Sequence, residues 1–410
     1  MEDQTLPVAN RSRNSIVFVR TVRRALALLV AMIVVTVAAP SQAAEPYDIY
    51  VILPLTGFAA FGGQTAQATL HALEGIANKQ GGIHGRPIRF VIEDDQSSPQ
   101  VAVQLTNAII AKKAPVMLGS AISAMCLAQA STVHDGPVDW CFSPVPRPPA
   151  GSFQFVTSQT TDDYLAACLR YAQGRGWKRI AVFSTTDASG ADFDASLDRI
   201  LALPESRGQT IVDREHFNVT DLSAAAQMSR VKSAAPDAIF GWATGTAMGT
   251  LLRAANDAGV DLPMFTTPAN MLHSQLRSLN SMIPTTLLFP GTAVYAPDQL
   301  RAGPAKQAVL DFREALRANG IEADTAAVLP WDPAAIVIGA LRKLGTDATA
   351  EQIRSYIAGY KGVGVSGNFD FTAHPQRGLD ASTVLIVRWD KALKDLKSVS
   401  SFGGKPNRNQ

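Results

Sequence analysis

A run of small and polar residues, GSAIS at 119–123, follows a short apolar segment at 116–118 that is typical of a strand. Loops that leave the carboxyl ends of parallel strands form the usual ligand-binding edge of an α/β sheet. A helix that begins near Ser123 would direct the positive end of its dipole at an anion. A serine in this place is also a common N-cap, and one residue can serve both roles. We therefore take Ser123 as the leading candidate for a contact with a bound anion.

Residues of catalytic type are present, but they form no recognised set. Ser229 and Lys232 fit the spacing SxxK, although a four-residue match is common by chance and its accompanying motifs are missing. Asp94 and Asp95 are adjacent carboxylates, which we interpret as a structural capping loop. The six histidines are scattered, and no GxSxG, HExxH, P-loop or Cys/His metal-ligand spacing occurs. The sequence predicts no enzyme activity, no catalytic residues, no cofactor and no metal site.

Two series of alternating strands and helices must position any site. The first series has predicted strands at 47–53, 88–92, 116–118 and 138–142. A proline-rich stretch at 143–149 interrupts the pattern, and the second series has predicted strands at 180–183, 209–212, 238–242 and 263–266. Strands joined by helical crossovers form parallel sheets wrapped by helices. We therefore predict an α/β protein with two lobes.

The first 44 residues have the three parts of a secretory signal peptide. Five arginines precede an apolar run at 25–39, and PSQAA at 40–44 offers small residues for cleavage. The apolar run is short for a membrane span, so cleavage is favoured over a retained anchor. Without this segment the chain has 32 basic and 33 acidic residues, a net charge of −1. A nearly neutral exported protein gives no electrostatic reason to expect binding to nucleic acid.

The chain has three cysteines, Cys126, Cys141 and Cys168. An exported protein meets an oxidising compartment, so one disulfide is possible. Cys126 and Cys141 are the better pair by their proximity in the sequence. Three buried thiols are an equally acceptable interpretation.

Several motifs occur in a characteristic order: LPLTG at 53–57, FG at 61–62, GGIHGRPI at 81–88, EDDQSSP at 93–99 and GSAIS at 119–123. Their order and spacing resemble type I periplasmic solute-binding proteins, in the Leu/Ile/Val-binding branch of ABC importer components. The resemblance covers residues 47–390, approximately the whole chain after the signal peptide. It implies two lobes, each a parallel sheet flanked by helices, joined by a hinge of several strands.

The resemblance also implies boundaries for each part of the chain. The expected parts are a first lobe at 45–157 and 291–377 and a second lobe at 158–290 and 378–397. The remaining tail at 398–410 is polar, and from this composition we expect it to be disordered.

Carrying over the contact positions of the family gives candidate ligand-binding residues between the lobes. They are Phe61, Ser123, Ala124, Val145, Arg147, Asp187, Ser189, Thr244 and Asn270. Phe61 stands where an aromatic side chain commonly covers the ligand, or it is a packed loop residue. Ser123 and Ala124 occupy the loop that in relatives binds a carboxylate.

Several candidates depart from the pattern of the family. Arg147 would pair with a carboxylate, or it is a solvated loop residue. Ser189 and Thr244 stand where relatives often have aromatic residues, which indicates room for a bulkier ligand. Asn270 lies in a loop that supplies an acid for the ligand's ammonium in amino-acid binders, and no acid occurs between 261 and 298. This absence argues against an α-amino acid unless Asp187 replaces the missing carboxylate.

We therefore expect a periplasmic substrate-binding protein that captures a small organic carboxylate with an aromatic or aliphatic body. The expected partner is an ABC permease in the inner membrane, and we expect a monomer. Three alternatives remain: a ligand sensor coupled to a membrane receptor or oxidoreductase system, a branched-chain amino-acid binder with a changed ammonium site, and a hydrolase that uses the same cleft.

Overall fold

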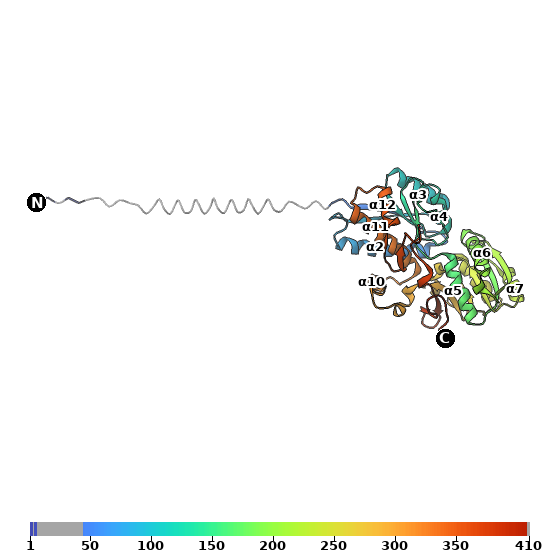
Figure 1. Cartoon of the computed structure of the whole chain (residues 1–410). Helices are drawn as coiled ribbons and strands as arrows, with labels where there is room; N and C mark the ends of the chain where they lie inside the picture. Colours follow the sequence, from blue (N-terminus) through green and yellow to red (C-terminus); the bar gives the residue numbers. More distant parts are fainter. Residues whose placement is uncertain (3, 6–43, 408–410) are drawn as a thin grey trace. The chain divides into compact units, whose positions relative to one another are not determined.

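The computed structural model describes residues 1–2, 4–5 and 44–407 (Figure 1). Residues 46–407 belong to one compact unit that contains two large β-sheets. Nearly all of the predicted signal peptide lies outside the described residues, so it stays a prediction. In the part of the chain that the structure describes, no helix combines the length and the apolar character that a membrane span requires.

The first sheet has five parallel strands in the order β2-β1-β3-β4-β5. Its strands are β1 (Tyr47–Leu53), β2 (Ile88–Asp94), β3 (Val116–Leu118), β4 (Val138–Cys141) and β5 (Gln154–Val156). Its helices are α2 (Ala60–Lys79), α3 (Pro99–Ala111), α4 (Ser123–Ala130), α11 (Thr325–Leu344) and α12 (Ala350–Ala358). Helices α2, α11 and α12 share one core with the sheet, and α3 packs on its other face. Because both faces are covered, β3 and β4 are fully buried, whereas the edge strand β2 is only partly buried.

The second sheet has seven strands in the order β14-β13-β10-β9-β8-β6-β7. The parallel strands are β6 (Arg179–Thr185), β7 (Thr210–Phe217), β8 (Ala238–Trp242), β9 (Met264–Phe265) and β10 (Leu287–Gly291). The antiparallel strands are β13 (Leu385–Asp390) and β14 (Asp395–Ser398). Its helices are α5 (Thr161–Gly174), α6 (Ala188–Leu201), α7 (Ala225–Ser233), α8 (Thr246–Asp257) and α9 (His273–Leu279). Residues of α5 and α6 share the core on one face, and residues of α7, α8 and α9 share the core on the other.

The remaining elements lie in the connections between these strands and helices. They are α10 (Pro304–Ala318), a ribbon of β11 (Lys361–Val363) and β12 (Asn368–Asp370), and the short 3₁₀ helices η1 (Pro204–Ser206), η2 (Pro268–Asn270), η3 (Ala293–Tyr295), η4 (Pro297–Gln299) and η5 (Ala381–Thr383). The predicted two-lobed α/β architecture is confirmed. We propose that the lobes divide at 157/158, 290/291 and 377/378, because each change of sheet falls near one of these points.

Some predicted boundaries were wrong by a few residues. The sequence also predicts a helix from about residue 64 to residue 79, but α2 begins at Ala60, and β7 continues to Phe217 instead of ending at residue 212. In both cases the extension runs through residues that weaken the expected pattern, two glycines in α2 and a charged segment in β7. Tertiary contacts override such local preferences.

The predicted disorder of the polar tail is wrong for residues 398–407. Ser400 is buried, and its hydroxyl accepts a backbone N–H of β13 at 2.7 Å. Gly404 packs so closely on α5 that a Cβ atom there would lie 2.2 Å from the carbonyl oxygen of Ala167. Serine hydroxyls of this segment are hydrogen-bonded within the protein, so a polar composition did not mean disorder.

The cysteine alternatives are settled by the fold. Cys126 on α4 and Cys141 on β4 form a disulfide, with their Cα atoms 5.7 Å apart. Cys168 is a buried free thiol on α5, and burial raises its pKa. The disulfide joins the start of α4, which follows the carboxyl end of β3, to the carboxyl end of β4.

Candidate functional site

A cavity of about 120 Å³ lies between the carboxyl edges of the two sheets. Its walls come from the loops after β1, β3, β4 and β5 on one side and after β6, β8 and β9 on the other, with residues of α2, α5, α9 and α11. Parallel sheets place ligand sites at this edge. The cavity is therefore the candidate site.

Most of the cavity wall is apolar. Five aromatic side chains contribute to it: Phe58, Phe61, Phe142, Tyr164 and Trp242. The indole of Trp242 stacks on the ring of Phe193 at 4.8 Å, which fixes its orientation from behind. Such a wall suits the apolar body of a small organic ligand.

One end of the cavity can bind an anion. Ser123 is the first residue of α4, and its buried hydroxyl lies 2.9 Å from the hydroxyl of Ser143. No side chain caps the N-terminus of α4, so the backbone N–H groups of its first turn lack the usual acceptor. These N–H groups and the two hydroxyls form a donor-rich end that suits a carboxylate.

Among the described residues that line the cavity, Asp187 carries the one formal charge. It is the N-cap of α6, where its Oδ1 accepts the backbone N–H of Gly190 at 3.1 Å. The same oxygen accepts the hydroxyl of Thr185 at 2.7 Å. Asp187 is thus held in a capping role on the cavity wall.

The structure brings six of the nine predicted contact residues to the cavity. They are Phe61, Ser123, Val145, Asp187, Ser189 and Thr244. Ala124, Arg147 and Asn270 do not line it. Ala124 follows Ser123 in α4 and is half-buried away from the cavity wall.

Asn270 does not line the cavity, and its side chain instead holds two loops of the second lobe together. Its side chain is fully buried, and Nδ2 donates to the carbonyl of Ala243 at 2.7 Å and to the hydroxyl of Thr266 at 2.9 Å. These bonds tie the loops after β8 and β9 together. The neighbouring Ala269 lines the cavity in its place.

The sequence analysis did not identify several residues that line the cavity, among them Phe58, Ser143, Tyr164, Trp242 and Gln275. Trp242 is the last residue of β8, so the strand-end rule that selected Ser123 could also have found it. Tyr164 and Gln275 lie on helices, where no local signal distinguishes them from core residues.

The sequence profile of a family described as periplasmic binding protein matches residues 46–394. This chain belongs to the periplasmic binding protein family. Members of the family bind solutes and are not enzymes, which confirms the predicted absence of enzyme activity. The chain is 25% identical over 365 residues to the leucine-, isoleucine-, valine-, threonine- and alanine-binding protein of Pseudomonas aeruginosa, covering 85% of this chain and 94% of that protein. The predicted Leu/Ile/Val-binding branch is likewise confirmed.

Solved structures share the fold of this periplasmic binding protein. An extracellular ligand-binding receptor from Rhodopseudomonas palustris superposes with a TM-score of 0.77 at 20% identity, covering 87% of this chain and all of that one. An ABC transporter solute-binding protein from R. palustris in complex with benzoate has a TM-score of 0.71 at 18% identity, covering 87% and 95%.

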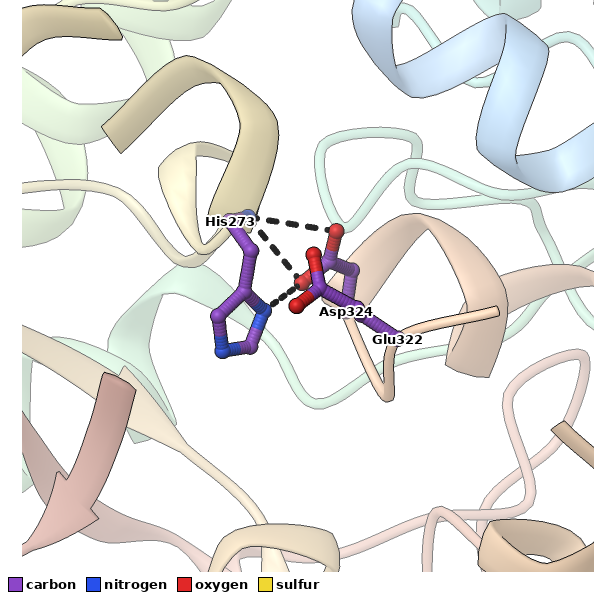
Figure 2. Close-up of side chains that lie close together, drawn as sticks. All are labelled: His273, Glu322 and Asp324. Carbon is purple, nitrogen blue, oxygen red and sulfur yellow. Dashed lines mark hydrogen bonds and ion pairs between the residues drawn. The ribbon is translucent and has the colours of Figure 1, made fainter. Parts of the chain in front are cut away.

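Beside the cavity, His273 joins the two lobes of this periplasmic binding protein (Figure 2). The ring Nδ1 and the backbone N–H of His273 both contact the carboxylate of Asp324, which precedes α11. The ring Nε2 lies 3.1 Å from Asp395 on β14. Burial opposes the charged ring, but the hydrogen bond and charge of Asp324, with help from Asp395, outweigh it and raise the pKa of His273.

Glu322 lies next to this pair, and ligand atoms of His273, Glu322 and Asp324 lie within 4.8 Å of one another. Such a group can in principle hold a metal ion. However, Glu322 forms an ion pair with Arg277 and the oxygens of Asp324 accept the N–H groups of His273. We therefore assign the three residues to a cluster of ion pairs between the lobes.

We expect the stability of the protein to fall as the pH rises above neutrality because of His273. The pKa of His273 is higher in the folded protein than in the unfolded chain. The stability that its charged ring contributes is therefore complete below the unfolded pKa and is lost as the pH rises through the folded pKa. A charged hydrogen bond of this kind contributes about 1.5–3 kcal/mol. Thermal unfolding of the natural protein and of His273→Asn between pH 5 and pH 9 measures the effect.

The Tm of the natural protein should exceed that of His273→Asn at low pH, and this difference should shrink as the pH rises. The matched control is His216→Asn, because His216 is an exposed histidine that also pairs with a carboxylate, Asp194. A Tm difference that stays the same from pH 5 to pH 9 would contradict a role for the charged ring of His273.

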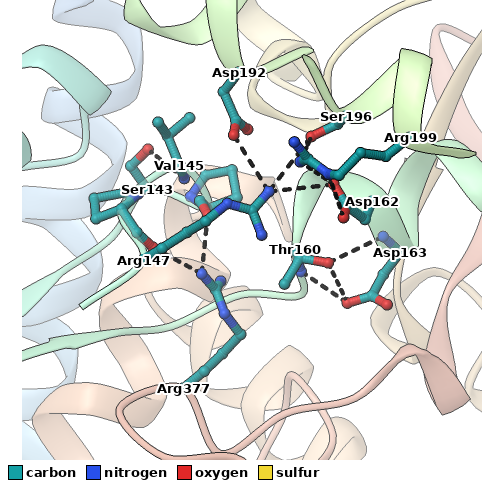
Figure 3. Close-up of polar contacts among 12 residues, drawn as sticks. Ser143, Val145, Arg147, Thr160, Asp162, Asp163, Asp192, Ser196, Arg199 and Arg377 are labelled. Atoms are coloured by element: carbon teal, nitrogen blue, oxygen red, sulfur yellow. Dashed lines mark hydrogen bonds and ion pairs between the residues drawn. The ribbon is translucent and has the colours of Figure 1, made fainter. Parts of the chain in front are cut away.

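A second cross-lobe contact involves Arg147, in the loop between β4 and β5 (Figure 3). Its guanidinium lies 3.2 Å from Asp162 on α5 and 3.3 Å from Asp192 on α6. The prediction that Arg147 contacts the ligand finds no support, since these acids already neutralise its charge outside the cavity. An exposed pair of this kind contributes at most about 1 kcal/mol to lobe closure.

Proposed function

We propose that this protein is the periplasmic substrate-binding component of an ABC importer. In this proposal the first 44 residues direct export and are cleaved, and the two lobes close on a solute and deliver it to a permease in the inner membrane. The solute is a small organic carboxylate with an aromatic or aliphatic body.

The observation that carries the ligand class is the asymmetry of the cavity. Its donor-rich end combines the N-terminus of α4 with Ser123 and Ser143, and the remaining wall is dominated by aromatic and aliphatic side chains. Ala269 lines the cavity in the loop that, by the resemblance, supplies an acid for the ligand's ammonium in amino-acid binders. The benzoate complex of the R. palustris protein adds support for an aromatic acid as the ligand.

An amino-acid ligand is the second candidate. The P. aeruginosa relative is named for its binding of leucine, isoleucine, valine, threonine and alanine, and Asp187 is an acid on the cavity wall. For this ligand Asp187 would have to pair with the ammonium while it also caps α6. A buried ammonium with a poorly placed counter-charge is costly, so we rank this candidate lower.

Thermal-shift measurements on the exported protein distinguish these candidates. The compounds are benzoate, 4-methylpentanoate, hexanoate, benzamide, and the amino acids leucine, valine and phenylalanine. A ligand at about 100 times its Kd stabilises by roughly 2.7 kcal/mol, which raises the Tm visibly. We expect acids without an amine to stabilise the protein, and stabilisation by amino acids alone would contradict the proposed ligand class.

A further inference from the structure

The indole N–H of Trp242 is a hydrogen-bond donor on the cavity wall without an acceptor among the described residues. Trp242 is the last residue of β8, lines the cavity and is only 3% exposed. Its Nε1 is not sealed in the protein interior, in contrast to Nε1 of Trp140, which is enclosed in the core of the first lobe without a partner. The small exposed surface of Trp242 therefore presents an unused donor to the cavity.

The orientation of this donor is restricted by packing. The indole stacks on the ring of Phe193 on α6, with the ring centroids 4.8 Å apart and an angle of 17° between the ring planes. Phe193 is fully buried, so the indole has a packed surface behind it. A buried indole N–H normally has a partner. Because Trp242 is already held in place, a ligand that accepts this N–H would lose little free energy in ordering the side chain.

The surroundings of Trp242 restrict the kind of acceptor. An indole N–H can only donate, so the opposing group must offer a lone pair. Asp187 lies nearby on the same wall, because the hydroxyl oxygen of Thr185 lies 2.7 Å from Asp187 Oδ1 and 3.5 Å from the backbone carbonyl oxygen of Trp242. A carboxylate placed here would be repelled by the like charge of Asp187, whereas a neutral oxygen would not. The carboxylate of the ligand therefore belongs at the N-terminus of α4, and Trp242 suits a neutral acceptor.

We propose that Trp242 recognises a neutral acceptor oxygen, of a ketone or an ether, on the body of the bound acid. The natural ligand is then a carboxylic acid with an acyl or alkoxy group, instead of a plain hydrocarbon acid. The first lobe binds its carboxylate and the second lobe binds its other oxygen, so both ends of the ligand favour closure. This inference rests on the proposed capture of a carboxylate in the same cavity. A site that offers a buried donor discriminates against an analogue without the acceptor, because the donor is then left unpaired.

Isothermal titration with pairs of acids of similar size tests the inference. In each pair an oxygen replaces a carbon group. The aromatic pairs are 4-acetylbenzoate with 4-isopropylbenzoate and 4-methoxybenzoate with 4-ethylbenzoate, together with the corresponding 3-substituted acids. The aliphatic pairs are 4-oxopentanoate with 4-methylpentanoate and 5-oxohexanoate with 5-methylhexanoate. We expect the oxygen-bearing acid of at least one pair to bind ten-fold or more tightly than its hydrocarbon partner.

The variant Trp242→Phe keeps an aromatic ring against Phe193 but removes the N–H. We expect the preference for the oxygen-bearing acid to fall below three-fold. The smaller ring also weakens packing against both acids of a pair, so the ratio of their affinities is the readout. Phe58→Leu is the matched control, because Phe58 also lines the cavity but has no side-chain donor. It should lower both affinities and leave the preference intact.

Nuclear magnetic resonance gives a second readout that needs no variant. The protein has five tryptophans, and Trp242 is the one of them that lines the cavity. With ¹⁵N-labelled tryptophan, one indole N–H signal should move downfield when the preferred oxygen-bearing acid binds, and it should move less with the hydrocarbon partner. If Trp242→Phe does not fold, this measurement decides the question. An indole spectrum that is the same with both acids of the pair would overturn the inference.

The results separate the inference from the proposed function. If hydrocarbon acids bind but no oxygen-bearing partner is preferred, or if the preference survives in Trp242→Phe, the inference is overturned and the proposed function stands. Tighter binding of benzene-1,4-dicarboxylate than of 4-acetylbenzoate would overturn the neutral acceptor. If no acid in any pair binds, the proposed function fails and the inference fails with it.

Discussion

Replacing Gly245 by alanine should reduce ligand affinity by about 100-fold, equivalent to about 2.7 kcal/mol, while the protein remains folded. Gly245 precedes α8 in the second lobe and has a φ of 59°. A Cβ atom there would lie 2.4 Å from the carbonyl oxygen of Phe58, which belongs to the loop before α2 in the first lobe. A backbone carbonyl cannot move aside as a flexible side chain can. The two lobes would therefore have to separate at this contact, and the cavity would open to water.

Gly259→Ala is the matched control for this variant. Gly259 follows the same helix, α8, and also has a positive φ of 62°, but a Cβ atom there would meet nothing within 4 Å. Both positions have a positive φ, so alanine adds backbone strain of about 1–3 kcal/mol in either variant. Isothermal titration with the acid that stabilises best in the thermal-shift panel gives the comparison. Equal affinities of the two variants would show that contact between the lobes at Gly245 does not limit ligand capture.

Replacing Arg377 by methionine should lower the free energy of unfolding by about 3 kcal/mol or more. Figure 3 shows Arg377 beside the loop that carries Val145. The guanidinium of Arg377 is buried and donates to three carbonyls, those of Ser158 at 2.7 Å, Pro146 at 2.9 Å and Pro144 at 3.1 Å. Burial lowers the pKa of Arg377 to about 10, so the side chain is still charged at neutral pH. Methionine fills similar space but leaves these carbonyls without their donor, at about 1–3 kcal/mol for each group that stays unpaired.

Urea unfolding of Arg377→Met and of Arg317→Met measures this cost. Arg317 is an exposed arginine paired with Glu314 on α10, so its loss should change stability by less than about 1 kcal/mol. The Arg377 variant should also bind acids more weakly, since the loop that it holds carries Ser143 and Val145 to the cavity. Equal unfolding midpoints for the two variants would show that Arg377 does not stabilise this loop.

Local rules located part of the site from the sequence. Ser123 was found because an apolar strand, a small polar loop and a helix start occur there in direct succession, and the structure has the same order. Asn270 was assigned to the ligand through its loop, but its amide turns into the core and Ala269 takes the cavity position. A loop can be placed by its order in the chain, whereas the direction of each side chain depends on tertiary contacts.

Other features required the folded chain. Arg147 was a candidate for binding a ligand carboxylate, but it forms ion pairs with Asp162 on α5 and Asp192 on α6. Both helices belong to the second lobe, so the positions of these residues in the sequence did not indicate that they pair with Arg147. Gln275 gave no signal in the sequence either, because only the folded chain brings its Nε2 to the carbonyl of Gly245.

A crystal structure of the protein with the acid that stabilises it best tests the central claim most directly. The account predicts density for one acid between the two sheets, with its carboxylate within hydrogen-bond distance of the Ser123 hydroxyl and the first N–H groups of α4. Its apolar body should lie among the rings of Phe58, Phe142 and Trp242. An acid bound elsewhere, or bound in the cavity with its carboxylate away from α4, would contradict the account.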